Sequence, residues 1–518
     1  MTDKYYLRIA RASDLKDKKE RAFYRMLEIL PGLFNWGTII AAIALSYFKP
    51  VWMAFFALIL VAYWLFRATY FSFHLRASYA RMKREDKIDW MQKLENLKEI
   101  SSELPAKNWQ DIYHLIVLPM LKEPYEVVRS SIQALLDTDY PKEKFIVILA
   151  QEEKGGQEAR ETGERIKQEF TSKFLKFIVT THPYGLSGEI AAKSSNEVWA
   201  SRKAKDIVDE LGITYENILF TSFDIDSVAS KHYFSCLCYH YLTTKKPLRT
   251  SFQPIPLFLN NIWQVPALSR LFSFSTSFWH ITNQERQDKL ITFSSHSMPF
   301  KALIDVGFKQ PDVVSDDSHI FWQCLLFYDG DYRVESLYSS ISMDANVGES
   351  FFRTLINIYK QQRRWAYGVS EVPYFIFGFW KNKKIPFKKK LSLGFEVIEG
   401  HWNWACAPIL LAFLGWLPIV LGGSEFNQTM FSYNLPRYTG RLLTFAMLGL
   451  FSYMYYTFYL LPPKKDSKKG KIKIVIACMQ WLLFPITMIF FVAAPALDAQ
   501  LRLCLGKYMG FWPTPKYR

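Results

Sequence analysis

Several features are scarce or missing in this sequence, and each absence excludes a class of protein. The 518-residue chain has six cysteines, and Cys236 and Cys238 show neither metal-site spacing nor a second matching pair, so we expect reduced, structural thiols. There is no internal repeat and no glycine-rich phosphate loop of the P-loop or dinucleotide type. Residues 1–28 are dense in charge and lack the apolar core and cleavage site of a signal peptide. We therefore expect the N-terminus to stay in the cytoplasm.

Acidic residues are outnumbered, with 48 Asp and Glu against 64 Lys and Arg, which gives a net charge of +16 and a pI near 9.3. The basic residues concentrate beside apolar runs and do not form one arginine-rich face. Anionic lipid headgroups attract such segments by roughly 1 kcal/mol per cation. The charge therefore predicts membrane lipids as partners, and no nucleic acid.

The mean hydropathy of −0.03 hides long apolar stretches at both ends of the chain. Residues 33–66 are almost uncharged, and Lys49-Pro50 divides them into two runs, the second of which extends to Phe73. A helix needs about twenty apolar residues to cross the hydrocarbon, so we expect a transmembrane helical hairpin. Three further runs are long enough to span a membrane, at residues 402–421, 442–461 and 474–497.

Two lysine clusters, at residues 381–390 and 464–473, flank the later spans and predict their orientation, because basic flanks are retained in the cytoplasm. This places the polar central block in the cytoplasm and the tail after Leu497 outside, although the basic residues of that tail, Arg502, Lys507, Lys516 and Arg518, argue against the last step. The predicted organisation is an N-terminal cytoplasmic or interfacial segment (1–30), a transmembrane hairpin (31–73), a cytoplasmic block with interfacial segments (74–390), three transmembrane helices (391–498) and a C-terminal tail (499–518).

The central block alternates between short apolar runs and helical patterns. Runs of strand length occur at residues 114–118, 145–150, 174–180 and 217–221, and helical patterns at residues 125–136 and 156–170. This alternation predicts an α/β fold in which helices cover a parallel sheet. Ligands of such sheets bind outside the carboxyl ends of the strands. The polar residues that follow the strands are Glu123, Gln151-Glu152-Glu153, His182 to Lys193, and Asp224-Ile225-Asp226.

Asp224 and Asp226 are separated by one residue, directly after the last of these strands. Both carboxylates can approach one hard divalent ion such as Mg²⁺, which substrate phosphates would complete. That ion would neutralise the leaving group of a nucleotide diphosphate. The alternative is a solvated turn.

Asp316 and Asp317 open a helix expected over residues 318–327. Helix capping favours acidic residues at this position. Alternatively, one of them is a general base whose pKa is raised by burial or by the adjacent like charge. The sequence alone does not distinguish the helix-capping role from the general-base role.

Residues 361–365, Gln-Gln-Arg-Arg-Trp, lie on a helix expected over residues 351–367. Gln361, Arg364 and Trp365 then share one face, at positions i, i+3 and i+4. Arginine offers paired donors to a pyrophosphate, and tryptophan offers a flat wall to a sugar or base. A basic helix near a membrane would contain the same residue types.

Taken in order, these motifs resemble those of membrane glycosyltransferase family 2, which includes cellulose, chitin and hyaluronan synthases and ceramide glucosyltransferases. The resemblance covers roughly residues 112–368 and implies an A-type nucleotide-sugar fold, an inverting reaction and a bound Mg²⁺ or Mn²⁺. By this match Asp317, paired with Asp316, is the catalytic base, Asp226 the metal ligand and Asp224 the acid on the diphosphate side. The same match makes Gln361, Arg364 and Trp365 contacts of the acceptor and pyrophosphate.

The match also assigns Glu123 to the first nucleotide-binding loop and Lys193 to the lysine that precedes the D-x-D strand. The family usually has an aspartate at the end of the second strand, where this chain has Gln151-Glu152-Glu153 and Glu152 is the best candidate. Asp316-Asp317 replaces the usual Glu-Asp pair and keeps both charges. No gating-loop motif of cellulose synthases is present, which argues against a long polymer channel.

The sequence therefore predicts an integral enzyme of the cell (inner) membrane that transfers a hexose from a nucleotide-diphosphate sugar to a glycan or lipid acceptor. Transfer of a single sugar to a membrane lipid is one alternative, and a non-catalytic scaffold or sensor with the same fold is another. Residues 255–280 are expected either in the membrane interface or in the core of the domain. Residues 294–300, with His296, are expected near the acceptor or in a solvated loop.

Overall fold

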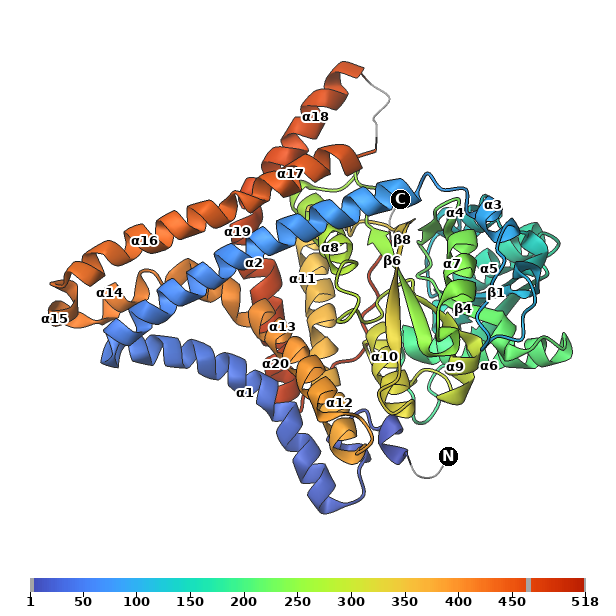
Figure 1. Cartoon of the computed structure of the whole chain (residues 1–518), viewed down its shortest axis with the longest axis horizontal. Coiled ribbons are helices and arrows are strands. Elements are labelled where there is room, and N and C mark those ends of the chain that lie inside the picture. Colours follow the sequence, from blue (N-terminus) through green and yellow to red (C-terminus); the bar gives the residue numbers. More distant parts are fainter. Residues whose placement is uncertain (1–3, 463–466, 517–518) are drawn as a thin grey trace.

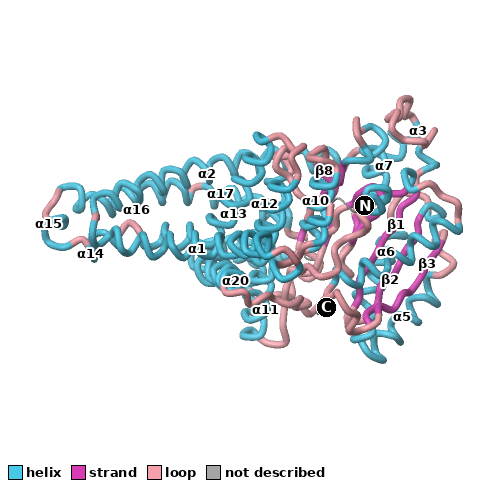
Figure 2. Tube along the Cα trace, turned by 90° about the horizontal axis from the view of Figure 1, so that it is seen from below, coloured by secondary structure: helices cyan, strands magenta, loops and turns pink. Residues whose placement is uncertain are grey.

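The computed structural model describes residues 4–462 and 467–516, with side chains omitted for residues 467–471, so part of the second lysine cluster lies outside the described residues. Two regions lie side by side (Figure 1). One is a sheet covered by helices, and the other is an elongated helical lobe that extends away from the sheet (Figure 2).

The sheet has eight strands in the order β3-β2-β1-β4-β7-β6-β8-β5. Strands β3, β2, β1 and β4 are parallel, as are β6 and β8, whereas the remaining pairs are antiparallel. The strands are β1 (Tyr113–Met120), β2 (Phe145–Glu152), β3 (Lys176–His182), β4 (Ile218–Ser222), β5 (Val228–Ala229), β6 (Thr250–Leu257), β7 (Ser297–Pro299) and β8 (Arg333–Ser342). The four strands predicted from the sequence are therefore β1 to β4, and the parallel-dominated sheet is confirmed.

Alternate residues of the central strands face opposite layers, as the pleat of a strand requires. In β1, Leu115 and Val117 join the core beneath α6 (Lys193–Glu210), α9 (Phe300–Asp305) and α10 (Asp316–Phe327). Ile116 and Leu118 join the opposite core beneath α4 (Tyr125–Leu136), α5 (Gly156–Phe170) and α7 (Tyr233–Thr243). Both faces of β1 are buried, which explains why its sequence is continuously apolar.

The predicted hairpin is the pair α1 (Lys18–Phe48) and α2 (Pro50–Glu85), which extend beyond the predicted range in both directions. Their large side chains face outward: Phe48, Trp52 and Phe66 are 71%, 73% and 74% exposed. Such a surface is stable in contact with lipid rather than water. Among the described residues, three helical stretches are long and apolar enough to cross a membrane: Lys18–Phe48, Pro50–Glu85 and Ile472–Cys504.

The predicted spans 402–421 and 442–461 are helical but divided into shorter helices. The first lies in α13 (Phe387–Phe413) and α14 (Leu417–Leu421), and the second in α16 (Met430–Met447) and α17 (Gly449–Leu460). Together with α1 and α2 these helices form the lobe, with α15 (Gly423–Asn427) at its tip (Figure 1).

The segment predicted as the last span crosses the base of the lobe, where it packs against α1 and α13 (Figure 1). It comprises α18 (Ser467–Met479), α19 (Phe484–Thr487) and α20 (Ala494–Cys504), joined by one 3₁₀ and one π turn. Helix α20 packs against α1 and against α11 (Phe351–Ala366). Gly32 of α1 permits this close approach, because a Cβ there would lie 2.6 Å from the Cβ of Cys504.

The predicted placement of the C-terminal tail outside the membrane is wrong. Lys516 lies 2.6 Å from Asp226 of the central block, so the tail lies on the same side as that block. The N-terminal segment also contacts this block, where Lys4 pairs with Asp329 at 2.7 Å. Hydropathy alone did not reveal that the last apolar segment crosses the base of the lobe.

The apolar segment 255–280 is divided between two elements. Ile255 belongs to β6, and the rest leads into α8 (Ala267–Asn283). Phe274 and Phe278 are buried in a core shared with Trp481 and the end of α17. The segment therefore joins the sheet to the helical region. Of the two predicted locations, the membrane interface and a buried core, the core fits most of the segment.

Candidate functional site

The predicted site residues come from the ends of strands and from three helices, α6, α10 and α11. Asp224 and Asp226 lie directly after β4, and Lys193 begins α6. Asp316 and Asp317 form the first turn of α10, two residues earlier than the expected start of that helix. The side chain of the preceding residue, Ser315, makes no capping hydrogen bond.

Lys193 joins the two acidic motifs. Its ammonium lies 2.8 Å from Asp224 and 3.1 Å from Asp317, although these carboxylates are 93 positions apart in sequence. Burial lowers the pKa of Lys193, but the two carboxylates outweigh this effect and raise the pKa well above its ordinary value. The fold therefore holds a charged lysine between the predicted diphosphate-side acid and the predicted base.

A second buried lysine neutralises the opposite side of the α10 pair. Lys309, 3% exposed, pairs with Glu197, with Asp316 at 2.9 Å and with Asp317 at 3.3 Å. It also donates a hydrogen bond to Ser222 at 3.1 Å. Each carboxylate of this cluster is therefore paired with an ammonium, as buried charges require.

The pKa values of Asp316 and Asp317 move in opposite directions. Burial and the neighbouring Asp317 raise the pKa of Asp316 to about 6. Burial also acts on Asp317, but the ammonium groups of Lys193 and Lys309 outweigh it and hold its pKa below the ordinary range. The prediction that one of the two has a raised pKa therefore holds for Asp316. It does not hold for Asp317, the residue that the family resemblance makes the base, because the sequence did not reveal the two lysines.

Asp226 is fully buried and has an unusual environment. One carboxylate oxygen, Oδ2, accepts a hydrogen bond from the backbone N–H of Asp344 at 2.8 Å and pairs with Lys516 at 2.6 Å. The other, Oδ1, is buried without a hydrogen-bond partner among the described residues. Burial raises the pKa of Asp226, an effect that Lys516 partly offsets. A buried carboxylate oxygen without a partner fits a hard cation, which prefers oxygen ligands.

Another group of carboxylates is close enough to hold a metal ion by distance alone. Atoms of Glu197, Asp316 and Asp317 lie within 4.8 Å of one another. However, the ammonium of Lys309 contacts all three. A cation there would repel this lysine. Asp224 and Asp226 also meet ammonium groups, those of Lys193 and Lys516, but each of these contacts only one of the two acids. Because Oδ1 of Asp226 keeps no partner among the described residues, Asp224 and Asp226 are the better candidates for a metal site.

The residues predicted on α11 contact three different parts of the chain. The side-chain oxygen of Gln361 accepts a hydrogen bond from Asn346 at 3.1 Å. The guanidinium of Arg364 stacks on Phe511 of the tail, 4.6 Å from the ring centroid. Burial lowers the pKa of Arg364, an effect that Asp224, Asp316 and Asp317 partly offset. Arg364 is thus electrostatically coupled to both acidic pairs.

Trp365, Glu123 and Glu152 are the remaining predicted site residues. The ring of Trp365 lies 6.2 Å from that of Phe258. Glu123 accepts hydrogen bonds from the backbone N–H groups of Leu121 and Lys122, and burial raises its pKa. Backbone hydrogen bonds and Lys516 partly offset this rise and Asp226 adds to it, so Glu123 lies in the electrostatic field of Lys516 and Asp226.

Glu152 lies at the rim of a cavity of about 200 Å³ at the ends of β2 and β3. Burial and then the neighbouring Glu123 raise its pKa to about 7. The same cavity is lined by His182, Tyr184 and Glu189, and His182 and Glu189 are 2.8 Å apart. The cavity therefore offers an aromatic ring and hydrogen-bonding groups next to the acidic centre.

Sequence reasoning missed four charged or polar residues of the site: Glu197, Lys309, Asp344 and Lys516. Glu197 stands one helical turn after Lys193, which is the one local signal among them. His296, expected near the acceptor, is fully buried 3.9 Å from Asp317, and burial lowers its pKa to about 3. Its ring is therefore neutral.

Comparison with curated proteins gives one partial match. No family model matches the chain. Over 152 residues it is 26% identical to the poly-β-1,6-N-acetyl-D-glucosamine synthase of Staphylococcus epidermidis, across 29% of this chain and 34% of that protein. The chain resembles membrane glycosyltransferases of family 2. The matched region spans about a third of the relative's length.

Solved structures show weaker similarity. A mannosyltransferase from Pyrobaculum calidifontis, in complex with GDP-Man and Mn²⁺, is 12% identical, with a TM-score of 0.42 over 86% of this chain and 100% of that chain. Residues 1–349 of S. aureus TarS, in complex with UDP-GlcNAc, are 10% identical, with a TM-score of 0.36 over 77% of this chain and 93% of that chain.

Proposed function

We propose that this protein is a membrane-embedded, inverting glycosyltransferase that moves a hexose from a nucleotide-diphosphate sugar to a glycan or lipid acceptor. One observation carries the proposal: a single buried ammonium, that of Lys193, contacts both Asp224 and Asp317. The acid predicted beside the leaving group and the acid predicted beside the acceptor therefore share one site. The partial match to a polysaccharide synthase supports a glycan product.

The proposed reaction is a single in-line displacement. Asp317 accepts the proton of the acceptor hydroxyl, and that oxygen forms the new bond to the anomeric carbon as the bond to the diphosphate breaks. Asp317 is 22% exposed and Asp316 is 4% exposed, so Asp317 is the accessible member of the pair. Asp316 pairs with Lys309 and so holds this lysine in position next to Asp317.

The low pKa of Asp317 keeps it ionised and ready to accept a proton. A carboxylate with so low a pKa is a weak base, because base efficiency is greatest when the pKa is near the operating pH. Phosphates of a bound donor would compete for the ammonium of Lys193. The pKa of Asp317 would then rise as the donor binds, which couples base strength to donor occupancy.

Asp226 and Asp224 would hold Mg²⁺ or Mn²⁺, which when bound neutralises the departing diphosphate. Arg364 supplies further positive charge near this site. The cavity beside Glu152 and Tyr184 fits the base of the nucleotide. Trp365 and Gln361 would contact the acceptor.

We place the catalytic block on the cytoplasmic side of the inner membrane. The N-terminal segment and the C-terminal tail both contact this block, so all three lie on one side. The exposed apolar surfaces of α1 and α2 contact lipid.

The test is turnover of a donor panel by the full-length protein in detergent. UDP- and GDP-linked hexoses and N-acetylhexosamines are incubated with Mn²⁺, with Mg²⁺ or with a chelator, and released nucleoside diphosphate is measured. We expect one donor class to be hydrolysed or transferred only when the metal is present. Product length then separates polysaccharide extension from single transfer to a lipid. Failure of every donor with both metals would contradict the proposal and favour the scaffold alternative.

A further inference from the structure

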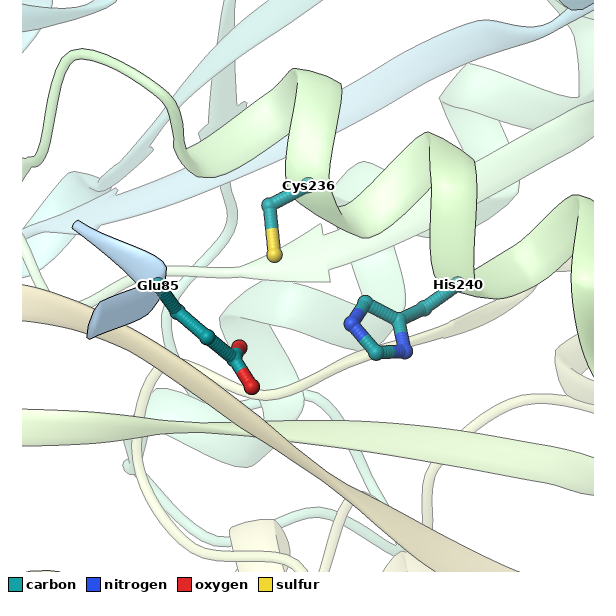
Figure 3. A group of neighbouring side chains, drawn as sticks. All are labelled: Glu85, Cys236 and His240. Carbon is teal, nitrogen blue, oxygen red and sulfur yellow. The ribbon is translucent and has the colours of Figure 1, made fainter. Parts of the chain in front are cut away.

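A second cluster of metal-binding residue types lies where the membrane hairpin meets the sheet domain. Glu85 is the last residue of α2, and Cys236 and His240 are one turn apart on α7. Their ligand atoms all lie within 4.8 Å of one another. Figure 3 shows the three side chains converging, with one ring nitrogen of His240 directed into the space between the carboxylate and the thiol.

Each of two side chains in this group has one anchored atom and one atom without a partner. Oε1 of Glu85 accepts a hydrogen bond from Arg81 at 2.9 Å, whereas Oε2 is buried and unpaired within the described part of the chain. Nδ1 of His240 lies 3.4 Å from Glu335, whereas Nε2 is buried and, among the same residues, also unpaired. A buried polar atom without a partner is costly, so the two together point to a missing ligand.

The surroundings of His240 resemble those of a metal ligand. Imidazole ligands usually interact through the second ring nitrogen with a carboxylate, which fixes the tautomer and directs the first nitrogen at the metal. Glu335 occupies that position, and its other oxygen accepts a hydrogen bond from Thr244 at 2.7 Å. The side chains of Glu85 and His240 are only 12% and 16% exposed, and Cys236 is fully buried.

We propose that Glu85, Cys236 and His240 bind one zinc ion. Sulfur, imidazole and carboxylate are all zinc ligands, and three protein ligands leave a fourth position for water. The thiolate selects Zn²⁺ over Mg²⁺ or Ca²⁺, which prefer oxygen. Zn²⁺ binds the thiolate as the thiol proton passes to solvent, so no electrons are transferred.

The zinc would have a structural role. It would fasten the end of α2, which continues directly from the transmembrane hairpin, to a helix of the sheet domain. Asp224, Asp226 and Asp317 belong to other elements, so this site is separate from the proposed glycosyl-transfer site and independent of that function.

The test uses cobalt in place of zinc, because Co²⁺ bound to a thiolate has a sulfur-to-metal charge-transfer band. Full-length protein in detergent is stripped of metal and titrated with Co²⁺. We expect one equivalent to produce the band and one equivalent of Zn²⁺ to abolish it. Co²⁺ bound only at Asp224 and Asp226 would give no such band, so absence of the band overturns the proposal.

Two variants test whether Cys236 supplies the sulfur ligand. Cys236→Ser is expected to lose the band, whereas the matched control Cys238→Ser, also buried on α7, is expected to keep it. If Cys236→Ser does not fold, Glu85→Gln takes its place and is expected to weaken Co²⁺ binding at least tenfold. A band that survives in Cys236→Ser, or an unchanged affinity in Glu85→Gln, would overturn the assignment.

An independent observation concerns the C-terminal tail, residues 505–516, which enters the proposed donor site. Gly506, with a φ of +69°, turns the chain after α20. Tyr508 then donates a hydrogen bond to Glu28 at 2.9 Å. Phe511 packs under Arg364, and Lys516 reaches Asp226.

We infer that this tail is an autoinhibitory strap that competes with the divalent cation for Asp226, an inference that rests on the proposed function. The ammonium of Lys516 is bound to one oxygen of the predicted metal ligand, and Phe511 covers the guanidinium predicted to bind the pyrophosphate. Two cations in contact with one carboxylate repel each other strongly in a buried site. Metal and donor binding would therefore displace the tail.

Mn²⁺ binding, measured by electron paramagnetic resonance without nucleotide, tests this inference without needing turnover. Lys516→Gln is expected to bind Mn²⁺ about tenfold more tightly than the wild type. Lys507→Gln, an exposed lysine of the same tail, is expected to match the wild type. Equal Mn²⁺ affinity in Lys516→Gln and wild type would overturn the strap, whereas failure of the donor panel alone would not.

Discussion

The two acidic pairs of the site have nearly the same composition but different surroundings. Asp316 and Asp317 are neutralised by two lysines from the folded core of the domain. Asp226 instead meets one lysine from the far end of the chain and keeps a buried oxygen without a partner among the described residues. The first pair is thus a completed ion cluster. The second pair also meets two lysines, since Lys193 contacts Asp224 at 2.8 Å, but the unpaired oxygen of Asp226 leaves room for a ligand. This difference teaches that burial, motif and nearby lysines alone do not define a metal site; a carboxylate oxygen left without a partner is the distinguishing feature.

The largest expected effect is on sugar transfer, and it distinguishes the functions of the two acidic pairs. Asp317→Asn keeps the size of the side chain but cannot accept the proton, so transfer should fall by about 10²- to 10⁴-fold. Affinity for the donor's nucleotide should change little, because the cation site is intact. Turnover and nucleotide binding are measured together, with the exposed Asp206→Asn as the control. Full activity of Asp317→Asn would show that another group is the base.

The next effect concerns the stability of the completed cluster. Lys309→Met leaves Glu197 and Asp316 buried without their shared ammonium, which should cost about 3–5 kcal/mol of the free energy of unfolding. Lys301→Met removes a more exposed partner of Asp305 and should cost only about 0–1 kcal/mol. Thermal unfolding of the two variants in the same detergent provides the comparison. Equal melting temperatures would contradict the view that Lys309 neutralises the cluster.

A smaller effect comes from a buried carboxyl with no lysine or arginine partner among the described residues. Glu371 accepts hydrogen bonds from Ser318 and Trp322, and burial raises its pKa to about 8. The folded protein therefore keeps a proton that the unfolded chain loses above about pH 4.5, so stability should fall as pH rises towards 8. The slope is at most about 1.4 kcal/mol per pH unit. Melting curves between pH 6 and 8 should show this slope in the wild type and not in Glu371→Gln, and parallel curves would argue against it.

Much of the sheet was predictable because its central strands β1, β2 and β4 are almost entirely buried and hence nearly continuously apolar. Residues 145–150 lie in β2 and residues 156–170 form α5 as expected, and β4 begins at Ile218, one residue after the expected start. The acidic motifs were found because each is local in sequence. The sequence did not reveal which charged residues form ion pairs, since Lys309 and Glu197 are 112 positions apart and belong to no motif.

The helical region was less predictable. Its apolar stretches were found, but hydropathy cannot distinguish a helix that runs along the lobe from one that crosses its base, so the tail was placed on the wrong side. The cluster of Glu85, Cys236 and His240 was missed for a similar reason. Glu85 ends an apolar helix about 150 positions before the other two, and only the fold brings them together.

The most direct test of the contrast between the two pairs is Mn²⁺ binding by the Asp226→Asn and Asp317→Asn variants in the presence of the donor's nucleoside diphosphate. We predict that Asp317→Asn binds one Mn²⁺ as tightly as the wild type, whereas Asp226→Asn loses at least tenfold in affinity. Retention of Mn²⁺ by Asp226→Asn, together with its loss in Asp317→Asn, would place the metal in the completed cluster and contradict the account.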